Sequence, residues 1–599
     1  MMVGPVLGAF DRLSPRTKTL LVWALLAVGF LLPLRGLLRS QGPPMEEGFM
    51  LVFPEQLMAG RIPNRDFLHL YGPGSLWWLA GIYQVFGVSL TVERLAALMQ
   101  MVWLVGGVAG IARRWGRSLA LICGAVSLLV IVPPIGLTAL AWTGAVGLGL
   151  CGIVAATESL RPNRSPRNAR RHAFAGGLLL GGALLFRVDL VIAVALAGYV
   201  VWRACDRPRR RALLGGAVAA VTPYFAHLAI AGPGNVFHGM VIEPVFDLRG
   251  GRKLPVPPSF THLQGFLQKA GDFGTKGKLP WPIPTLPAAA QIALWFWSLL
   301  AIVALIAVVA MRRQRRAPNS LRSVTLLAAA GFSVGILPQA LQRADSAHLA
   351  WVSCVPLALL PVALRELLEG QRGHSWTIRR LNIVAALPVV LFVAFAIPRY
   401  ILNSYADYVA QTLGRHRYSY EITRGDRNFY YGREEVAAAA QNELIPAMDR
   451  VVRDGDSLIV ATPDLRRTPY SDAYLYYLYP ELAVGTHYIE MDPGVANAVD
   501  TKLVDELAEA DVLVLSSVWW DWVEPNDSRI TIDNGANDVL LDRFVCVGEY
   551  GLLPPEAPAP MDFLYQLWVS ADVAAGRGIA AGNCDEGLLQ TPWPAPGPE

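Results

Sequence analysis

Residues 43–78 read PPMEEGFMLVFPEQLMAGRIPNRDFLHLYGPGSLWW, a polar stretch between two long apolar runs. The runs, at 18–38 and 91–112, are each long enough to cross a bilayer as a helix. The stretch carries acidic side chains at Glu46, Glu47 and Asp66. Charged side chains beside lipid are energetically costly, so they are usually either solvated or part of a functional site. The loop of residues 39–90 is therefore the first candidate for a functional site.

The composition of the chain indicates that lipid is part of its solvent. Of 599 residues, 53% are hydrophobic and only 17% are charged, which is too apolar for an ordinary soluble protein. Residues 1–400 carry 39 Lys+Arg and 15 Asp+Glu, whereas residues 401–599 carry 13 and 32. This contrast predicts a membrane domain at 1–400 and a physically different domain at 401–599.

The apolar stretches predict a polytopic α-helical membrane protein, because each supplies close to the 20 residues that a spanning helix needs. We place eleven spans at about 18–38, 91–112, 118–133, 136–157, 173–187, 189–204, 212–230, 287–311, 321–338, 349–366 and 380–400. The segment 74–87 is shorter and rich in aromatic residues, which favours a helix at the membrane interface.

Arginine-rich connections predict the orientation, since such loops stay in the cytoplasm. Every second connection is basic, which puts the N-terminus inside and the segments 39–90, 231–286, 339–348 and 401–599 outside. We expect the first span to be retained rather than cleaved. Abundant arginine, alanine, glycine and proline favour a bacterial cytoplasmic membrane. The arginine runs are assigned to topology, and no nucleic-acid partner is predicted.

The tail at 401–599 is predicted to be an extracytoplasmic α/β domain. Buried strands are indicated at 457–461 and 511–516, helices at 471–479 and 500–510, and further sheet pieces at 544–547 and 563–569. Cys546 and Cys584 either form a disulfide or remain thiols, and the sequence leaves both open. The many aromatic residues of the tail either bind sugar rings or pack.

The first loop resembles that of the GT-C superfamily of membrane glycosyltransferases, in the branch of protein mannosyltransferases and the aminoarabinose transferase of lipid A. The positions that match are Glu46-Glu47, Gly60, Pro63, Asp66, Pro73, Trp77 and Arg94. The stretch 176–190, GGLLLGGALLFRVDL, is similar to the family's glycine-rich fifth helix and its terminal arginine. The resemblance covers about the first 400 residues. It implies a polyprenyl-phosphate-linked sugar donor and an outer-face glycan, lipid or protein acceptor.

The implied reaction needs a base for the acceptor hydroxyl and a cation for the anionic leaving phosphate. Candidate bases are Glu46, Glu47 and Asp66, with Glu46 first by resemblance. Candidate phosphate ligands are Arg187, Arg343 and His348, and candidate substrate contacts are His69, Asp189 and Asp345. A divalent cation, Mg²⁺ or Mn²⁺, is an alternative source of positive charge, and no metal ligands are assigned.

Each candidate also has a structural interpretation. Glu46 and Glu47 suit a helix N-terminus, Asp66 suits a turn, and His69 suits packing between leucines. Arg187 and Asp189 suit an ion pair, and the loop at 339–348 suits an ordinary polar turn. Two other functions stay open. One is a transporter or flippase of an amphiphilic substrate, although the sequence shows no repeat between its halves. The other is a catalytically inactive scaffold that presents the acidic tail to partner proteins.

Overall fold

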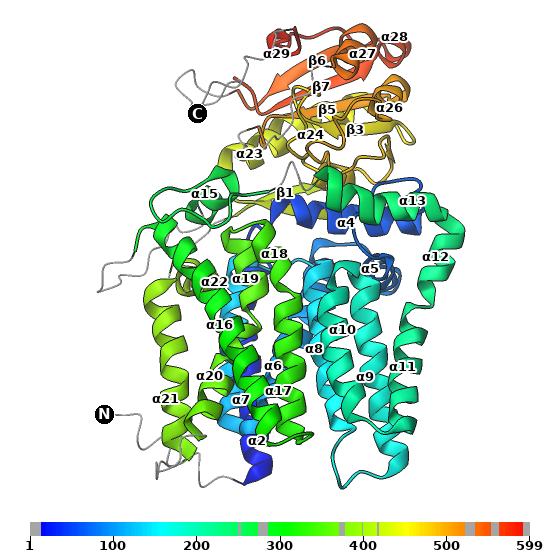
Figure 1. Ribbon diagram of the computed structural model, residues 1–599. Helices are drawn as coiled ribbons and strands as arrows, with labels where there is room; N and C mark the ends of the chain where they lie inside the picture. Colours follow the sequence, from blue (N-terminus) through cyan, green and yellow to red (C-terminus); the bar gives the residue numbers. More distant parts are fainter. Residues whose placement is uncertain are drawn as a thin grey trace.

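The computed structural model consists of a helical bundle with a β-sheet region stacked on one end (Figure 1). It describes residues 14–248, 253–273, 286–369, 378–397, 399–415, 419–520, 533–552 and 562–590. Between bundle and sheet lie α4 (Pro44–Met58), α5 (Pro73–Phe86), α13 (Pro233–Phe237) and the π-helix η3 (His238–Asp247). The polar stretch quoted above is therefore enclosed between the two parts of the molecule.

Helices occupy all eleven places at which spans were predicted. They are α2 (Pro15–Leu31), α6 (Leu90–Ala112), α7 (Arg117–Ile135), α8 (Ala141–Glu158), α9 (Pro166–Phe186), α10 (Val191–Ala204), α11 (Arg207–Val221) with α12 (Pro223–Ala231), α16 (Ala288–Arg316), α17 (Leu321–Gly335) with α18 (Leu337–Gln342), α19 (Ser346–Ser353) with α20 (Pro356–Glu369), and α21 (Ile378–Leu391). By length and hydropathy, six described helices qualify as spans, or seven if α19 and α20, bent by 42°, form one. The chain is a multi-pass membrane protein.

The remaining predicted spans fall short of these criteria for identifiable reasons. Helix α2 has 17 residues, and α10 and α21 have 14 each, against the roughly 20 that cross a bilayer without tilt or thinning. Helix α9 begins with the arginine-rich sequence PRNARR, which lowers its mean hydropathy.

Glycine lets α9 approach α11 closely. A Cβ at Gly177 would lie 1.9 Å from the carbonyl oxygen of Leu213, so only glycine fits. Small residues at such crossings are the usual way that membrane helices pack. This contact fixes α9, and therefore Arg187, which follows its last residue.

The basic connections meet at the end of the bundle away from the sheet (Figure 1). Glu158, the last residue of α8, forms ion pairs with Arg113, Arg114, Arg161 and Arg164 at 2.7–3.2 Å. These arginines belong to two different connections that were predicted to share one side of the membrane. The two connections do lie side by side.

The C-terminal region contains a hairpin and a mixed sheet. The hairpin pairs β1 (Tyr420–Arg424) with β2 (Arg427–Tyr431). The five-stranded sheet has the order β4-β3-β5-β7-β6, from β3 (Ser457–Ala461), β4 (Ala483–Val484), β5 (Val512–Ser516), β6 (Phe544–Tyr550) and β7 (Tyr565–Ser570). Strand β3 is parallel to β4 and β5, whereas β7 is antiparallel to β5 and β6.

Helices surround these strands. They include α23 (Glu434–Ala439), α24 (Ile445–Val451), α25 (Tyr474–Leu478), α26 (Leu503–Glu509), α27 (Gly535–Arg543), α28 (Ala571–Arg577) and α29 (Gly587–Gln590). Helix α22 (Ser404–Thr412) instead lies in the bundle, where it packs against α3 (Leu34–Leu37) and α7 (Figure 1). Cys546 and Cys584 are joined in a disulfide. Strands β3, β5, β6 and β7 lie at the predicted positions, whereas β1, β2 and β4 were not predicted. Helices α25 and α26 are shorter than the predicted helices.

Three kinds of contact attach the C-terminal region to α4 and its loop. Arg427 donates two hydrogen bonds to Glu55, at 2.7 and 2.8 Å. The backbone amide of Leu68 donates to the His487 carbonyl at 2.8 Å. A Cβ on Gly48 would lie 2.9 Å from the Tyr474 amide nitrogen, so the two backbones touch. Helix α4 is therefore held between the bundle and the C-terminal region.

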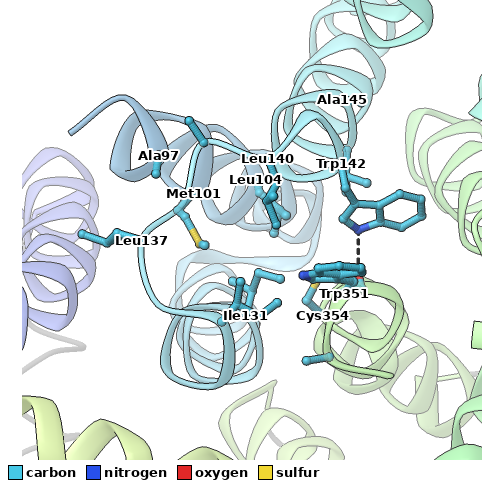
Figure 2. Close-up of a cluster of buried hydrophobic side chains, with 14 of the residues drawn as sticks. Ala97, Met101, Leu104, Ile131, Leu137, Leu140, Trp142, Ala145, Trp351 and Cys354 are labelled. Carbon is cyan, nitrogen blue, oxygen red and sulfur yellow. Dashed lines mark hydrogen bonds between the residues drawn. The ribbon is translucent and has the colours of Figure 1, made fainter. Parts of the chain in front are cut away.

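Figure 2 shows a cluster of buried apolar side chains in the helical bundle. It gathers Met101 from α6, Ile131 from α7, Trp142 from α8 and Trp351 from α19. The Trp142 indole Nε1–H donates to the Trp351 carbonyl at 3.4 Å, which links α8 to α19. Trp142 and Trp351 of this cluster also line a cavity.

Candidate active site

A cavity of about 210 Å³ lies where α4, the end of α9, the α18–α19 connection and the C-terminal region meet. Its floor includes Trp142 and Trp351 from the apolar cluster. The polar side chains that line it and were predicted from the sequence are Glu46, Arg187, Asp189, Arg343 and His348. Residues more than 300 positions apart in the chain thus share one site.

Arg187 and Asp189 form an ion pair at the wall of the cavity. The Arg187 Nε donates to Asp189 Oδ1 at 2.9 Å, and Nη2 donates to Oδ2 at 2.6 Å. The guanidinium also lies 4.4 Å from the ring centroid of Tyr71 and 5.2 Å from that of Trp142. The ion pair holds the buried guanidinium at the cavity wall. Arg187 can therefore form the ion pair with Asp189 and bind a ligand as well.

Arg343 is the second cation of the cavity, and its environment is different. It connects α18 to α19 and is only 8% exposed. Neither Nε nor Nη2 has a hydrogen-bond partner among the described residues. Burying donors of a charged group without partners is expensive. A buried guanidinium with unused hydrogen-bond donors is suited to binding an anion.

Asp345 and His348 form a hydrogen-bonded pair at the start of α19. Asp345 Oδ1 accepts from the backbone amide of His348 at 2.9 Å and so caps the helix. Asp345 Oδ2 lies 2.7 Å from His348 Nδ1. A carboxylate on Nδ1 fixes the ring orientation and leaves Nε2 for a ligand. Asp345 does not line the cavity, and it acts on the site through His348.

Glu46 and Glu47 face different surroundings because neighbours on a helix are about 100° apart. Glu46 is half-buried and lines the cavity. Glu47 is fully buried, and its carboxylate accepts hydrogen bonds from Nε and Nη2 of Arg94 at 2.6 and 2.9 Å. The bidentate pair anchors α4 to α6, so only the first acid of the pair reaches the cavity.

Asp66 and His69 lie outside the cavity. Asp66 accepts from the Ile62 amide and from Arg65, each at 2.8 Å, and the Arg65 hydrogen bond holds its pKa below the usual value. His69 packs between Phe53 and Tyr71, and burial lowers its pKa to about 3. Both residues shape the loop that carries Tyr71 and Leu70 to the cavity.

The donor atoms of the site suit an anion better than a metal ion. Within the described residues, no group of three or more His, Cys, Asp or Glu side chains is placed to hold a metal. Asp189 is engaged by Arg187, and Asp345 by His348. The positive charge at the cavity therefore comes from arginine.

Four polar side chains that line this cavity, Gln339, Gln342, Tyr470 and Glu490, were not predicted from the sequence. Tyr470 and Glu490 line it from the C-terminal region. They belong to the connection between β3 and β5, and no local pattern distinguishes them from the other tyrosines and acids of the tail. The aromatic walls Tyr71 and Trp142 were also missed, since an apolar sequence context gives no signal for a ligand.

Comparisons with known proteins support the fold. The chain matches no protein-family model and no curated protein. ArnT from Cupriavidus metallidurans, solved in the apo state and bound to undecaprenyl phosphate, aligns with a TM-score of 0.50 and 14% identity, over 94% of this chain and 99% of that chain. The Archaeoglobus fulgidus oligosaccharyltransferase aligns with a TM-score of 0.43 and 10% identity, over 92% of this chain and 76% of that chain. The chain therefore has the fold of ArnT.

Proposed function

We propose that this protein transfers a sugar from a polyprenyl phosphate carrier to a hydroxyl of a glycan, lipid or protein. The observation that carries the proposal is Arg343, a buried guanidinium whose Nε and Nη2 have no hydrogen-bond partner among the described residues. It lines the same cavity as Arg187 and a carboxylate at Glu46. The similar structure of ArnT is described as bound to undecaprenyl phosphate, which supports this class of donor.

Arg187 and Arg343 hold the donor phosphate in this proposal. Guanidinium groups bind phosphate oxygens through paired, charge-assisted hydrogen bonds. The same contacts strengthen as negative charge develops on the departing phosphate, which lowers the barrier. In its imidazolium form, with Nδ1 bonded to Asp345, His348 adds a third donor through Nε2. Asp189 keeps Arg187 in place.

Glu46 is the base in this proposal. The acceptor oxygen attacks the anomeric carbon and forms a new C–O bond, while the bond from that carbon to the phosphate oxygen breaks. Its electron pair leaves with the polyprenyl phosphate, and the acceptor proton moves to the Glu46 carboxylate. One direct displacement inverts the anomeric carbon. Arg187 and Arg343 stabilise the negative charge of the leaving phosphate in this scheme.

We also propose that the chain crosses a bacterial cytoplasmic membrane eleven times, with the sheet region outside. The gathering of arginines around Glu158 at the opposite end supports a cytoplasmic position for that end. The Cys546–Cys584 disulfide supports an oxidising compartment for the C-terminal region. The reaction then takes place at the outer face of the membrane.

The test is a transfer assay in proteoliposomes. Purified protein is supplied with undecaprenyl-phosphate-linked pentoses and hexoses and with a membrane extract as acceptor, and released undecaprenyl phosphate is measured. We expect Glu46→Gln to lower turnover by about 10²- to 10⁴-fold, as for loss of a general base. Glu434→Gln, an exposed acid of α23, is the matched control and should act as wild type.

The same preparation distinguishes transfer from transport. A transporter or flippase moves the lipid-linked sugar across the bilayer and leaves it chemically unchanged. Movement of the donor without release of undecaprenyl phosphate contradicts the proposal, as does full turnover in Glu46→Gln.

A further inference from the structure

The C-terminal region contributes two side chains to a cavity that is otherwise built by the membrane domain. Tyr470 and Glu490 are 1% and 8% exposed, and both line the cavity. They lie on two segments of the connection between β3 and β5. The Ser471 hydroxyl donates to the Ile489 carbonyl at 3.0 Å, so the two segments run against each other.

The backbone at these two segments is strained. Tyr470 has φ of 87°, and Met491, which follows Glu490, has φ of 49°. A bulky residue at positive φ is uncommon and energetically unfavourable. The Tyr470 amide donates to the Met491 carbonyl at 3.1 Å, which ties the two strained residues to each other. Such strain persists where the surrounding structure imposes it, and it concentrates at functional sites.

The segment after Tyr470 is held firmly against α4. The Tyr474 ring stacks on Phe429 with centroids 4.6 Å apart, and its hydroxyl lies 3.1 Å from that of Tyr565. Its backbone touches Gly48, two residues from Glu46. The position of the Tyr470 and Glu490 side chains is therefore fixed relative to Glu46.

The membrane domain and the C-terminal region contribute different groups to the cavity. The membrane domain supplies both cations and also the carboxylates of Glu46 and Asp189. Arg187 and Arg343 belong to the membrane domain, whereas Tyr470 and Glu490 belong to the region that covers it. A carboxylate accepts hydrogen bonds from hydroxyl groups, and a phenol both donates and accepts them. These are the groups that a sugar ring requires.

We propose that Tyr470 and Glu490 bind the sugar of the donor and select it by its hydroxyl groups. This inference rests on the proposed function, since it assigns a role within the same cavity. A sugar whose hydroxyls hydrogen-bond to these groups is favoured over an analogue that lacks a hydroxyl, because the analogue forms fewer hydrogen bonds in the cavity. The C-terminal region therefore sets the donor sugar, while the membrane domain recognises the phosphate.

The test separates sugar binding from phosphate binding. Glu490→Gln, Glu490→Ala and Tyr470→Phe are compared with Glu509→Gln, an exposed acid of α26 in the same region. For each variant we measure the Kd of undecaprenyl phosphate without sugar, the KM for each lipid-linked sugar, and the KM for the acceptor. Tyr470→Phe and Glu490→Gln preserve shape, and the Kd of undecaprenyl phosphate reports that the cavity is intact.

We expect Glu490→Ala to raise the donor KM by roughly 10- to 100-fold, as for loss of a hydrogen bond to a charged group, and to reduce the discrimination between sugars. The Kd of undecaprenyl phosphate and the acceptor KM should stay within about twofold of wild type, since no contact to either is removed. Unchanged donor selectivity in all three variants overturns the inference, and so does an effect confined to the acceptor KM. A wild-type protein that releases no undecaprenyl phosphate from any lipid-linked sugar contradicts the proposed function instead.

Discussion

Two adjacent acids, Glu46 and Glu47, have different surroundings, and this difference predicts different consequences of mutation. Glu47 is paired with Arg94 at a site where both side chains are 0% exposed. Removing one partner of a buried ion pair leaves an uncompensated charge and costs about 3–5 kcal/mol. We therefore expect Glu47→Leu to lower the free energy of unfolding, measured by thermal unfolding in detergent, whereas Glu46→Gln should unfold like wild type.

The double variant Glu47→Leu with Arg94→Met is the control for this prediction. Apolar replacement of both partners removes the buried charge together with its counter-charge, so the double variant should regain most of the lost stability. Equal stability of Glu47→Leu and wild type contradicts a structural role for the pair.

Arg343 gives a second prediction at this scale. Arg343→Ala removes donors that form charge-assisted hydrogen bonds to the phosphate, so undecaprenyl phosphate should bind roughly 10- to 150-fold more weakly. Arg343→Lys keeps the charge but not the paired geometry, and its Kd should be intermediate. The measurement is native mass spectrometry of purified protein with undecaprenyl phosphate. Wild-type affinity in Arg343→Ala would exclude this guanidinium as the phosphate ligand.

His487 predicts a pH dependence of stability. Burial, and then the positive charge of Lys502 and Arg61, lower the pKa of His487 to about 4 from an ordinary 6.5. In the unfolded chain His487 is protonated below about pH 6.5, whereas in the folded chain it is protonated only below about pH 4. The free energy of unfolding therefore falls as the pH drops from 6.5 to 4. The thermal midpoint of wild type should fall more steeply between these pH values than that of His487→Gln. Parallel curves for the two proteins would show that His487 does not contribute.

At the scale of elements, the close contact of α4 with α25 predicts the effect of an added methyl group. A Cβ on Gly48 would lie 2.9 Å from the Tyr474 backbone nitrogen, which cannot rotate away. We expect Gly48→Ala to destabilise by about 1–3 kcal/mol, the usual range for overpacking, and to lower transfer activity because Glu46 moves. Gly81→Ala in α5 meets no atom within 4 Å and is the control, with unchanged or slightly raised stability. Equal behaviour of the two variants contradicts the contact.

The positions of many elements could be predicted from sequence, but their contacts could not. Strands β3 and β5 lie where short apolar runs indicate them, and helices lie at each predicted span. Arg187, Arg343 and Glu46 were identified because charges stand out against an apolar background. Tyr470 and Glu490 were not, because they reach the cavity only through packing between distant segments. Likewise, no pattern indicates that Arg94 engages Glu47 rather than Glu46.

The whole molecule has two ends of different chemistry, and this predicts its orientation. In a variant without Cys123, Cys151, Cys205 and Cys354, an exposed cysteine is introduced on α26 as Glu509→Cys or on α9 as Arg171→Cys. We expect a membrane-impermeant maleimide to label Glu509→Cys in intact spheroplasts and Arg171→Cys only after permeabilisation. The reverse pattern would place the cavity on the cytoplasmic side and contradict an outer-face reaction.

The central claim is that the cavity between bundle and sheet binds a polyprenyl phosphate donor through Arg187 and Arg343. An experimental structure of the purified protein with saturating undecaprenyl phosphate tests it most directly, since it locates the ligand and its protein contacts together. We expect phosphate density within hydrogen-bond distance of the Arg343 Nε and Nη2 atoms and of the Arg187 guanidinium, on the same side of the cavity as His348. Phosphate density at another place, or a cavity without density under saturating lipid, would contradict it.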